Sequence, residues 1–485
     1  MRKQYRYCYL ILHLFLATAV CRAQTTQTSP TAELLEQLIR INTSNPPGNE
    51  VQVDRFLAAK LKPLGFETEI IPTPEAGKAH FLARLKGNGS KKPILLAAHA
   101  DVVGVERSQW SVDPFAGIEK DGYVYGRGAL DNKGSLAVFT EALIELAKNK
   151  VPLDRDIILL SEADEESGKY NTEWLAEHYF DKIDCAASLN EGGWIMENPR
   201  GAVQYVSIST ADKLSVWLTL TSHGTSTHSS MPVPNDAIFT LAQALAKLSN
   251  YGTRLQFTPG SRQFLLTLSE TSPEPMSKTY SDLVQNSDPA QVVAADKTVS
   301  KNPLLHAILH NTIAPVFLNA GFRRNVIPGT AQAMINMRLI PGSKIDDVIR
   351  EIQTVVDNPR VDVKLSDGAG LSSASSMISG DEKLRAHIRA LSEIQQSPTD
   401  TALYKALASQ AEAEFHAPVT PYLFQAGTDA FAWRKRGIPV YGIYPYPVSS
   451  SDIQRMHGND ERISVRSLDQ GTVMIYKVLI QVAAQ

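Results

Sequence analysis

The sequence predicts an α/β catalytic domain, with a mostly parallel sheet and helices on both faces, plus an inserted α+β lid or dimerisation domain. Residues 93–98 form a continuous apolar run, residues 156–160, 186–189 and 440–443 are similar, and helical stretches such as residues 136–148 lie between them. Runs that are apolar on both faces are typical of strands covered by helices on both sides. Alternating and amphipathic segments in the middle of the chain predict the inserted domain.

The first 23 residues are typical of a secretory signal peptide. Basic residues precede an apolar stretch over residues 10–20, and we expect cleavage after Ala23, which would leave the protein secreted or periplasmic. The stretch is far shorter than the roughly 20 residues of a membrane-spanning helix, so we expect no stable membrane span. Lipid attachment at Cys21 is the alternative.

The length and the net charge of the chain limit the kinds of protein it can be. A chain of 485 residues is long enough for two or more domains. The formal net charge is −3, from 48 basic and 51 acidic residues without a long basic run, so we expect no nucleic-acid partner. Cys185 is the one cysteine after the leader, which excludes an internal disulfide.

The first part of the catalytic domain is expected over residues 24–207. Residues 31–41 have a helical periodicity that is broken at Asn45-Pro46-Pro47-Gly48-Asn49. Residues 51–64 then form a second helix, which ends at Gly65.

We expect the inserted domain over residues 208–368 and the rest of the catalytic domain over residues 369–485. The order strand-helix-strand-strand-helix-strand predicts a small sheet with helices on one face. Five of these six elements are located in the sequence, namely strands at residues 214–221, 331–339 and 361–365, and helices at residues 236–248 and 345–356. Residues 255–302 are polar and rich in proline and serine, so we expect an irregular excursion there.

Potential metal ligands follow the apolar runs of the catalytic domain. His99 ends one run, Glu165 and Glu166 lie just past another, and Glu191 follows a third. Ligands in open α/β sheets bind beyond the carboxyl ends of the strands, so we expect these side chains to meet on one rim. Imidazole nitrogen and carboxylate oxygen are ligands that zinc accepts.

Asp131 is the natural carboxylate to bridge two zinc ions, which lie about 3.5–4 Å apart in two-metal sites. It lies in a glycine-punctuated turn at residues 126–134. A phosphate-binding loop is the alternative interpretation of this turn, but the turn lacks the P-loop spacing.

Two further roles follow from the neighbours of these ligands. Residues i and i+2 of an extended segment point the same way, so the Asp101 carboxylate can accept the second imidazole N–H of His99. Glu165 and Glu166 cannot both face one ion from a regular strand, so one should bind metal while the other takes a proton from water. A Glu-Glu pair in a solvated loop is the alternative.

Together these motifs resemble those of the co-catalytic zinc exopeptidases and aminoacylases, a family that includes glutamate carboxypeptidase, carboxypeptidase S, aminoacylase-1 and succinyl-diaminopimelate desuccinylase. The resemblance covers nearly all of the chain after the leader. It rests on His99-Ala100-Asp101, residues 126–134, Glu165-Glu166, His228-Ser229-Ser230 and the segment around His457, in the family's order. Trp110, Asp113-Pro114-Phe115 and the long excursion resemble the carboxypeptidase S branch.

The resemblance implies two zinc ions, for which cobalt can substitute, and assigns roles around them. Asp131 would bridge the ions, commonly with a cis peptide to the next residue. The implied ligands are His99 and Glu191 for one ion, and Glu166 and His457 for the other. Glu165 would be the general base, and Asp101 would orient His99.

The resemblance also implies substrate contacts. His228 would stabilise the oxyanion that forms during hydrolysis. Asn325 and Arg338 would contact substrate from the lid, and Arg338 could clamp a terminal carboxylate with its planar guanidinium. Gly427 would offer a backbone contact.

The expected protein is therefore a two-zinc hydrolase that cleaves a small peptide or an N-acyl amino acid beside a free carboxylate, through a metal-bridging water. A two-zinc aminopeptidase or dipeptidase and a catalytically inactive metal-binding module are the alternatives. A serine hydrolase is disfavoured because the sequence has no Gly-x-Ser-x-Gly elbow. The resemblance also implies a possible homodimer, because many relatives pair through the lid, and in those the partner supplies the oxyanion histidine. The long excursion could block such pairing.

Overall fold

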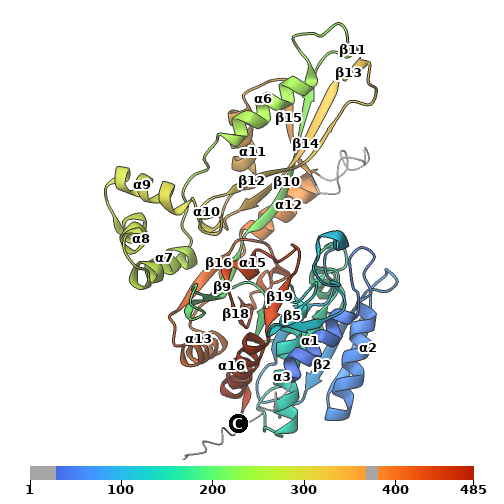
Figure 1. Cartoon of the computed structure of the whole chain (residues 1–485), viewed down its shortest axis with the longest axis vertical. Helices are drawn as coiled ribbons and strands as arrows, with labels where there is room; N and C mark the ends of the chain where they lie inside the picture. The colour runs from blue at the N-terminus through green and yellow to red at the C-terminus, as the bar shows by residue number, and fades with distance from the viewer. Residues whose placement is uncertain (1–28, 367–380) are drawn as a thin grey trace, which may run out of the picture.

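The computed structural model describes residues 29–366 and 381–485, so the expected signal peptide, its cleavage site and Cys21 lie outside the described residues. Figure 1 shows a large α/β body below a smaller body of strands and helices. Within the described ranges, no helix combines the length and the apolar character that crossing a membrane requires.

The large body is built on one sheet. Its strands are β1 (Glu67–Pro72), β2 (Ala79–Leu85), β3 (Ile94–His99), β6 (Ile157–Glu162), β7 (Ala187–Asn190), β8 (Ile195–Glu197), β9 (Val203–Asp212), β16 (Val419–Phe424), β17 (Val440–Gly442) and β18 (Pro447–Val448). They follow the order β1-β2-β6-β3-β7-β17-β9-β8-β18, with β16 beside β9. The four central strands β6, β3, β7 and β17 run parallel, so their carboxyl ends share one edge.

Helices cover both faces of this sheet, as predicted. Along β3, Leu96 packs into a core with helices α1 (Pro30–Arg40), α2 (Glu50–Leu61), α3 (Lys133–Lys148), α13 (Ala402–Phe415) and α16 (Val465–Ala483). The next residue, Ala97, packs into a second core with α4 (Thr172–His178), α5 (Phe180–Ile183) and α14 (Phe431–Arg434). Alternate residues of a strand face opposite sides, which is why the run is apolar throughout.

A separate three-stranded sheet joins the two ends of the catalytic domain. It has the order β19-β5-β4. Its strands are β4 (Ile118–Lys120), β5 (Tyr123–Tyr125) and β19 (Arg462–Ser464). The pairing of β5 with β19 brings the segment after the short helix α15 (Ser450–Ile453) beside the turn that carries Asp131.

The inserted body is a four-stranded antiparallel sheet. Its strands are β10 (Leu214–His223), β12 (Thr312–Ala320), β14 (Thr330–Leu339) and β15 (Val361–Ser366), in the order β12-β14-β10-β15. Helices α6 (Ala237–Ser249) and α11 (Ile345–Val356) share one apolar core with the strands, as the predicted element order requires. Helix α12 (Asp381–Ser392) contributes Ile388 to the same core.

The chain passes between the two sheets at Lys213. Strand β9 stays in the large sheet through Asp212, beyond the predicted boundary at residue 207, and β10 begins at Leu214. The predicted return at residues 368/369 lies outside the described residues.

The prediction of an irregular excursion over residues 255–302 is wrong. The structure has three helices there, α7 (Pro259–Thr271), α8 (Met276–Gln285) and α9 (Pro289–Val299), and α10 (Pro303–Leu309) directly follows. The prolines open helices: Thr258, Asp288 and Asn302 are N-caps, and each is followed by proline at the first helical position. Apolar residues of these helices belong to the catalytic-domain core rather than to the core of the lid. Helix α7 lies beside β9 and β16, α8 packs on α7, and α9 packs on α8 (Figure 1).

Candidate dinuclear metal centre

The predicted ligands that follow strands lie on one rim, as expected. His99 is the last residue of β3, and Glu191 directly follows the neighbouring strand β7. Glu165 and Glu166 lie in a turn after β6, which pairs with β3 on its other side. Because they are in a turn rather than a strand, both glutamates reach the rim, within ligand distance of His99.

Asp131 lies between two imidazoles. One carboxylate oxygen is 3.0 Å from Nε2 of His99, and the other is 3.1 Å from Nε2 of His457. The peptide bond from Asp131 to Asn132 is cis, as the resemblance implied. Two oxygens that face two different imidazoles are the arrangement that a bridging carboxylate requires.

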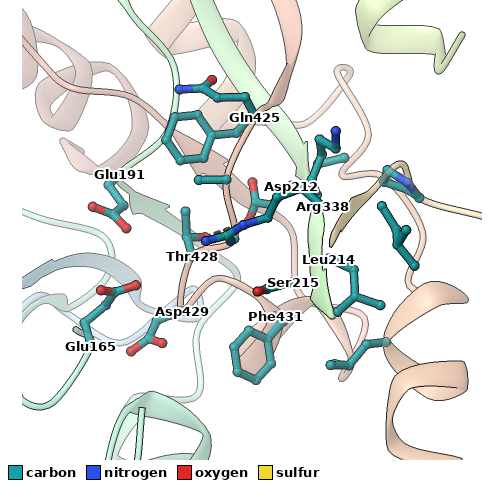
Figure 2. A pocket seen from close by; sticks show the side chains of 18 of the residues that line it. Glu165, Glu191, Asp212, Leu214, Ser215, Arg338, Gln425, Thr428, Asp429 and Phe431 are labelled. Carbon is teal, nitrogen blue, oxygen red and sulfur yellow. Dashed lines mark hydrogen bonds between the residues drawn. The ribbon is translucent and has the colours of Figure 1, made fainter. Parts of the chain in front are cut away.

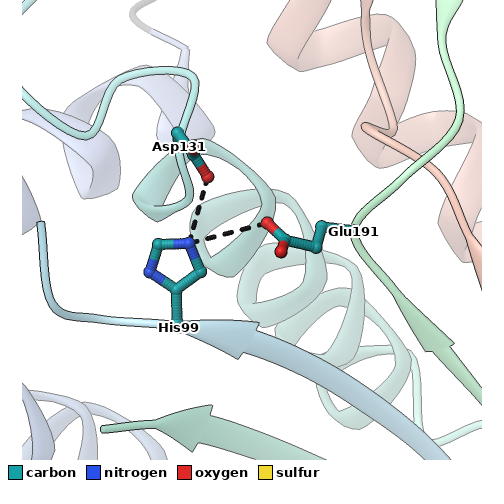
Figure 3. Close-up of side chains that lie close together, drawn as sticks. All are labelled: His99, Asp131 and Glu191. Carbon is teal, nitrogen blue, oxygen red and sulfur yellow. Dashed lines mark hydrogen bonds and ion pairs between the residues drawn. The ribbon is translucent and has the colours of Figure 1, made fainter. Parts of the chain in front are cut away.

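Two ligand groups form around Asp131. Glu191 completes the first, with its carboxylate 3.5 Å from Nε2 of His99 (Figure 3). Glu166 completes the second, with its carboxylate 3.0 Å from Nε2 of His457. Within each group the ligand atoms lie within 4.8 Å of one another. All five residues that the sequence analysis names as ligands therefore converge, and they supply the imidazole and carboxylate donors that suit zinc.

Four carboxyl groups and two imidazoles converge at the centre. Burial raises the pKa of Glu191 to about 7. Burial and the nearby Glu191 raise the pKa of Glu165 well above its usual range. Burial opposes ionisation of Asp131 too, but hydrogen bonds from His457 and His99 hold its pKa below the usual range. Crowded buried carboxylates of this kind are stabilised by bound cations.

Asp101 supports the centre in a different way from the one predicted. The His99 Nδ1–H donates to the main-chain oxygen of Asp101 at 2.9 Å, which leaves Nε2 free for a ligand, while the Asp101 carboxylate is 3.6 Å from Nδ1. That carboxylate instead accepts from the backbone N–H groups of Glu165 and Glu166, at 3.2 and 3.1 Å. The strand ends at His99, so the i, i+2 alternation does not extend to Asp101.

A cleft of about 760 Å³ opens from the centre toward the inserted domain. Arg338 on β14 lines it, and Figure 2 shows its guanidinium on the side of Glu165 and Glu191. Gly427 also lines the cleft, and a side chain there would meet Nη1 of Arg338 at 3.5 Å. Both predicted substrate contacts therefore line the cleft that the predicted metal ligands Asp131, Glu166, Glu191 and His457 also line.

The other two predicted substrate contacts lie elsewhere. His228 ends strand β11 (Thr227–His228), which pairs with β13 (Val326–Ile327), and Ser229 donates to the main-chain oxygen of Asn325. These short strands occupy the far tip of the inserted domain (Figure 1), and neither His228 nor Asn325 lines the cleft. His228 therefore lies away from the metal centre formed by the same chain.

Two residues that were not predicted as site residues contact the predicted ligand Glu191. The Tyr444 hydroxyl donates to Glu191 at 3.1 Å, and the Asn132 side chain donates to the same oxygen at 3.1 Å. Asp429 also lines the cleft, beside Glu165 in Figure 2. Tyr444 follows the apolar run at residues 440–443, so the rule that found His99 and Glu191 could have found it.

Comparisons with known proteins agree with this geometry. Residues 95–481 match the model of peptidase family M20/M25/M40. The chain is 27% identical over 412 residues to human N-fatty-acyl-amino acid synthase/hydrolase PM20D1, covering 83% of this chain and 76% of the human protein. It is 30% identical over 400 residues to "Probable carboxypeptidase S-like 2" of Dictyostelium discoideum, covering 80% of this chain and 72% of that protein.

Solved structures confirm the predicted fold class. The M20 family metallo-carboxypeptidase Sso-CP2 from Sulfolobus solfataricus is similar with a TM-score of 0.67 at 16% identity, covering 94% of this chain and 99% of that one. Human carnosine dipeptidase 1 is similar with a TM-score of 0.62 at 17% identity, covering 93% of this chain and 95% of that one.

Proposed function

This chain belongs to peptidase family M20/M25/M40, and from that premise we propose that it is a two-zinc amidohydrolase that cleaves an amide bond beside a free carboxylate. The substrate would be an N-acyl amino acid or a small peptide. The printed names of two relatives, an N-fatty-acyl-amino acid synthase/hydrolase and a carboxypeptidase S-like protein, support this class, because an N-acyl amino acid and a peptide C-terminus both carry a free carboxylate.

The observation that carries the proposal is the guanidinium of Arg338 in the cleft, which has no ion-pair partner among the residues that the structure describes. Its Nε donates to the Asn336 side chain at 3.1 Å, and among the described residues no carboxylate lies within ion-pair distance of it. The nearby Asp212 instead pairs with Arg434 at 2.7 Å. Burial lowers the pKa of the Arg338 guanidinium. A partly buried cation without an anion, facing the metal ligands, is suited to hold a substrate carboxylate.

The remaining steps of hydrolysis would be carried out by the bound ions, Glu165 and Arg338. Bound zinc ions would polarise the scissile carbonyl and acidify the attacking water. Glu165 faces the cleft and is not needed by either ligand group around Asp131, so it would take the proton from the water. It would then deliver that proton to the leaving nitrogen, while Arg338 holds the carboxylate that fixes the amide in place.

A substrate panel tests the proposed function. Purified protein is assayed with N-acyl amino acids, with the same compounds amidated at the carboxylate, and with dipeptides that have free or acylated amines. We expect hydrolysis only where the carboxylate is free, loss of activity with a chelator, and recovery with zinc or cobalt. Activity that requires a free amine and tolerates an amidated carboxylate would instead support an aminopeptidase.

Replacing Arg338 by methionine is expected to weaken the use of carboxylate-bearing substrates. Hydrogen bonds to charged groups contribute about 1.5–3 kcal/mol each, so losing a two-bond clamp should lower kcat/KM by roughly 100-fold or more. Steady-state kinetics would show the change mainly in KM. Asn336→Ala is the matched control, since it removes the neighbour of Arg338 and leaves the cation; an unchanged KM in Arg338→Met would exclude the clamp.

We also propose that the enzyme works as a homodimer that pairs through the inserted domain. Strand β12 is at the edge of the small sheet, and three of its consecutive apolar residues are exposed: Val316 by 51%, Phe317 by 45% and Leu318 by 68%. Exposed apolar edge strands are prone to pair with another chain. Helices α7–α10 pack on the catalytic domain and leave this strip uncovered. A dimer would let His228 of the partner subunit complete a site that this chain does not complete alone.

Charge on the β12 strip should separate the subunits. We expect Phe317→Asp with Leu318→Asp to give a monomer by sedimentation velocity and to lower kcat by about 10²–10³-fold, the typical cost of losing one oxyanion donor. Val293→Asp, at an apolar residue of α9 that is 68% exposed, should leave mass and activity unchanged. A wild-type protein that is monomeric and fully active at assay concentration would contradict the proposal.

A further inference from the structure

A buried ion pair joins the two loops that supply Asp131 and His457. Glu461 follows His457 by four residues, and its side chain is fully buried. One carboxylate oxygen accepts from the backbone N–H groups of Leu130 and Asp131, at 2.7 and 3.1 Å. The other accepts from the backbone of Gly128 at 3.1 Å and from the guanidinium of Arg127.

Arg127 also joins the two loops, by a hydrogen bond from the Asp131 turn to the His457 loop. Its side chain belongs to the Asp131 turn, yet its second terminal nitrogen donates to the main-chain oxygen of Gly458 at 2.8 Å. Arg127 is 2% exposed, and its guanidinium lies 5.4 Å from the ring centre of Trp110. The Arg127–Glu461 pair is thus hydrogen-bonded on both sides, which is the condition under which a buried pair holds a defined geometry.

The loop around His457 needs such support. His457 has a φ of +58°, a left-handed conformation that non-glycine residues rarely adopt. Strained residues of this kind persist only where the surrounding contacts fix them. The bond from Arg127 fixes the peptide between Gly458 and Asn459, one residue beyond His457, while Glu461 fixes the peptide that leads into Asp131. The Arg127–Glu461 pair therefore fixes the positions of both Asp131 and His457.

We propose that Glu461 and Arg127 are positioning residues that fix Asp131 and His457 at the spacing needed to bind the second metal ion. The inference rests on the proposed two-zinc centre. It assigns a role in metal affinity to two residues that do not themselves reach the ions. The rival explanation is that the pair only stabilises the fold, in which case its loss would lower stability without changing zinc affinity.

Replacing Glu461 by glutamine separates these explanations. Glutamine keeps the size but has one acceptor oxygen and no charge, so it cannot serve Arg127 and the three backbone N–H groups together. Zinc affinity is measured by competition with a chromogenic chelator, and Tm is measured on the metal-free protein. We expect the affinity for the more weakly held zinc ion to fall by about 10–100-fold, the usual effect of removing a partner that orients a ligand.

The matched control is Asp156→Asn. Asp156 also accepts from a backbone N–H, that of Gly87 at 3.0 Å, and from an arginine, Arg84 at 3.1 Å, but it precedes the opposite end of β6 from the metal ligands. It should lower Tm and leave zinc affinity at the wild-type value. Glu461→Gln with wild-type zinc affinity, whatever its Tm, would overturn the proposal.

If Glu461→Gln does not fold, a second variant tests the same proposal. Arg127→Lys keeps the positive charge but cannot reach both Glu461 and Gly458 with a planar fork, so weaker zinc binding is again expected. The proposed function fails separately: a wild-type protein that binds two zinc ions but hydrolyses no member of the substrate panel would leave the positioning role intact. A wild-type protein that binds no zinc would overturn both.

Discussion

Glu165→Gln is expected to keep both metal ions and to lower kcat by about 10²–10⁴-fold, the usual contribution of a general base. Glutamine has nearly the same shape as glutamate, but its amide cannot take a proton from water. Glu165 lines the cleft, and its carboxylate is not a member of either ligand group around Asp131. Steady-state kinetics, together with a zinc count on the same protein sample, measure both parts of this prediction.

The adjacent residue is the control for this experiment. Glu166 lies 3.0 Å from Nε2 of His457, so Glu166→Gln should lose one zinc ion as well as activity. The zinc count decides between the two glutamates, because Glu165 also lies within ligand distance of His99. Loss of a zinc ion from Glu165→Gln would make Glu165 a ligand, and near-normal turnover would remove it from proton transfer.

Asp131→Ala is expected to lose both zinc ions and all measurable hydrolysis. Its two oxygens face His99 and His457 at 3.0 and 3.1 Å. Among the described residues, Asp131 is the one side chain shared by the group of His99 and Glu191 and the group of Glu166 and His457. Without the bridge, each ion keeps only two of the ligands assigned to it, and the two positive charges lose the carboxylate between them. Metal analysis after gel filtration measures the effect.

The histidine variants make this prediction specific. His99→Ala and His457→Ala each remove a ligand from one group, so each should lose one ion more readily than the other. Asp131→Ala should resemble the double histidine variant rather than either single one. An Asp131→Ala protein that still binds one zinc ion with wild-type affinity would show that the carboxylate is not shared.

Local patterns in the sequence predicted several of the side chains that converge in the structure. His99 and Glu191 end or follow apolar runs, and parallel strands bring such residues to one edge. The position of Asp131 in a turn rich in glycine supported its assignment as the bridge. His457 came from the family resemblance, since a lone histidine has no local signature.

Other features depend on contacts that local patterns do not contain. Helices α7, α9 and α10 form in and directly after the proline-rich residues 255–302 because an N-cap precedes the first proline of each, and proline at that position starts a helix instead of breaking one. The Asp101 carboxylate turned out to hold the turn of Glu165 and Glu166. Glu461 binds a loop more than 300 residues away in sequence, and no periodicity could indicate that partner.

Diffraction from zinc-loaded crystals at the zinc absorption edge tests the central claim most directly. The account predicts two anomalous peaks per chain, about 3.5–4 Å apart. One peak should lie between His99 and Glu191, the other between Glu166 and His457, with one oxygen of Asp131 on each. A single peak, or two peaks that do not share Asp131, would contradict it.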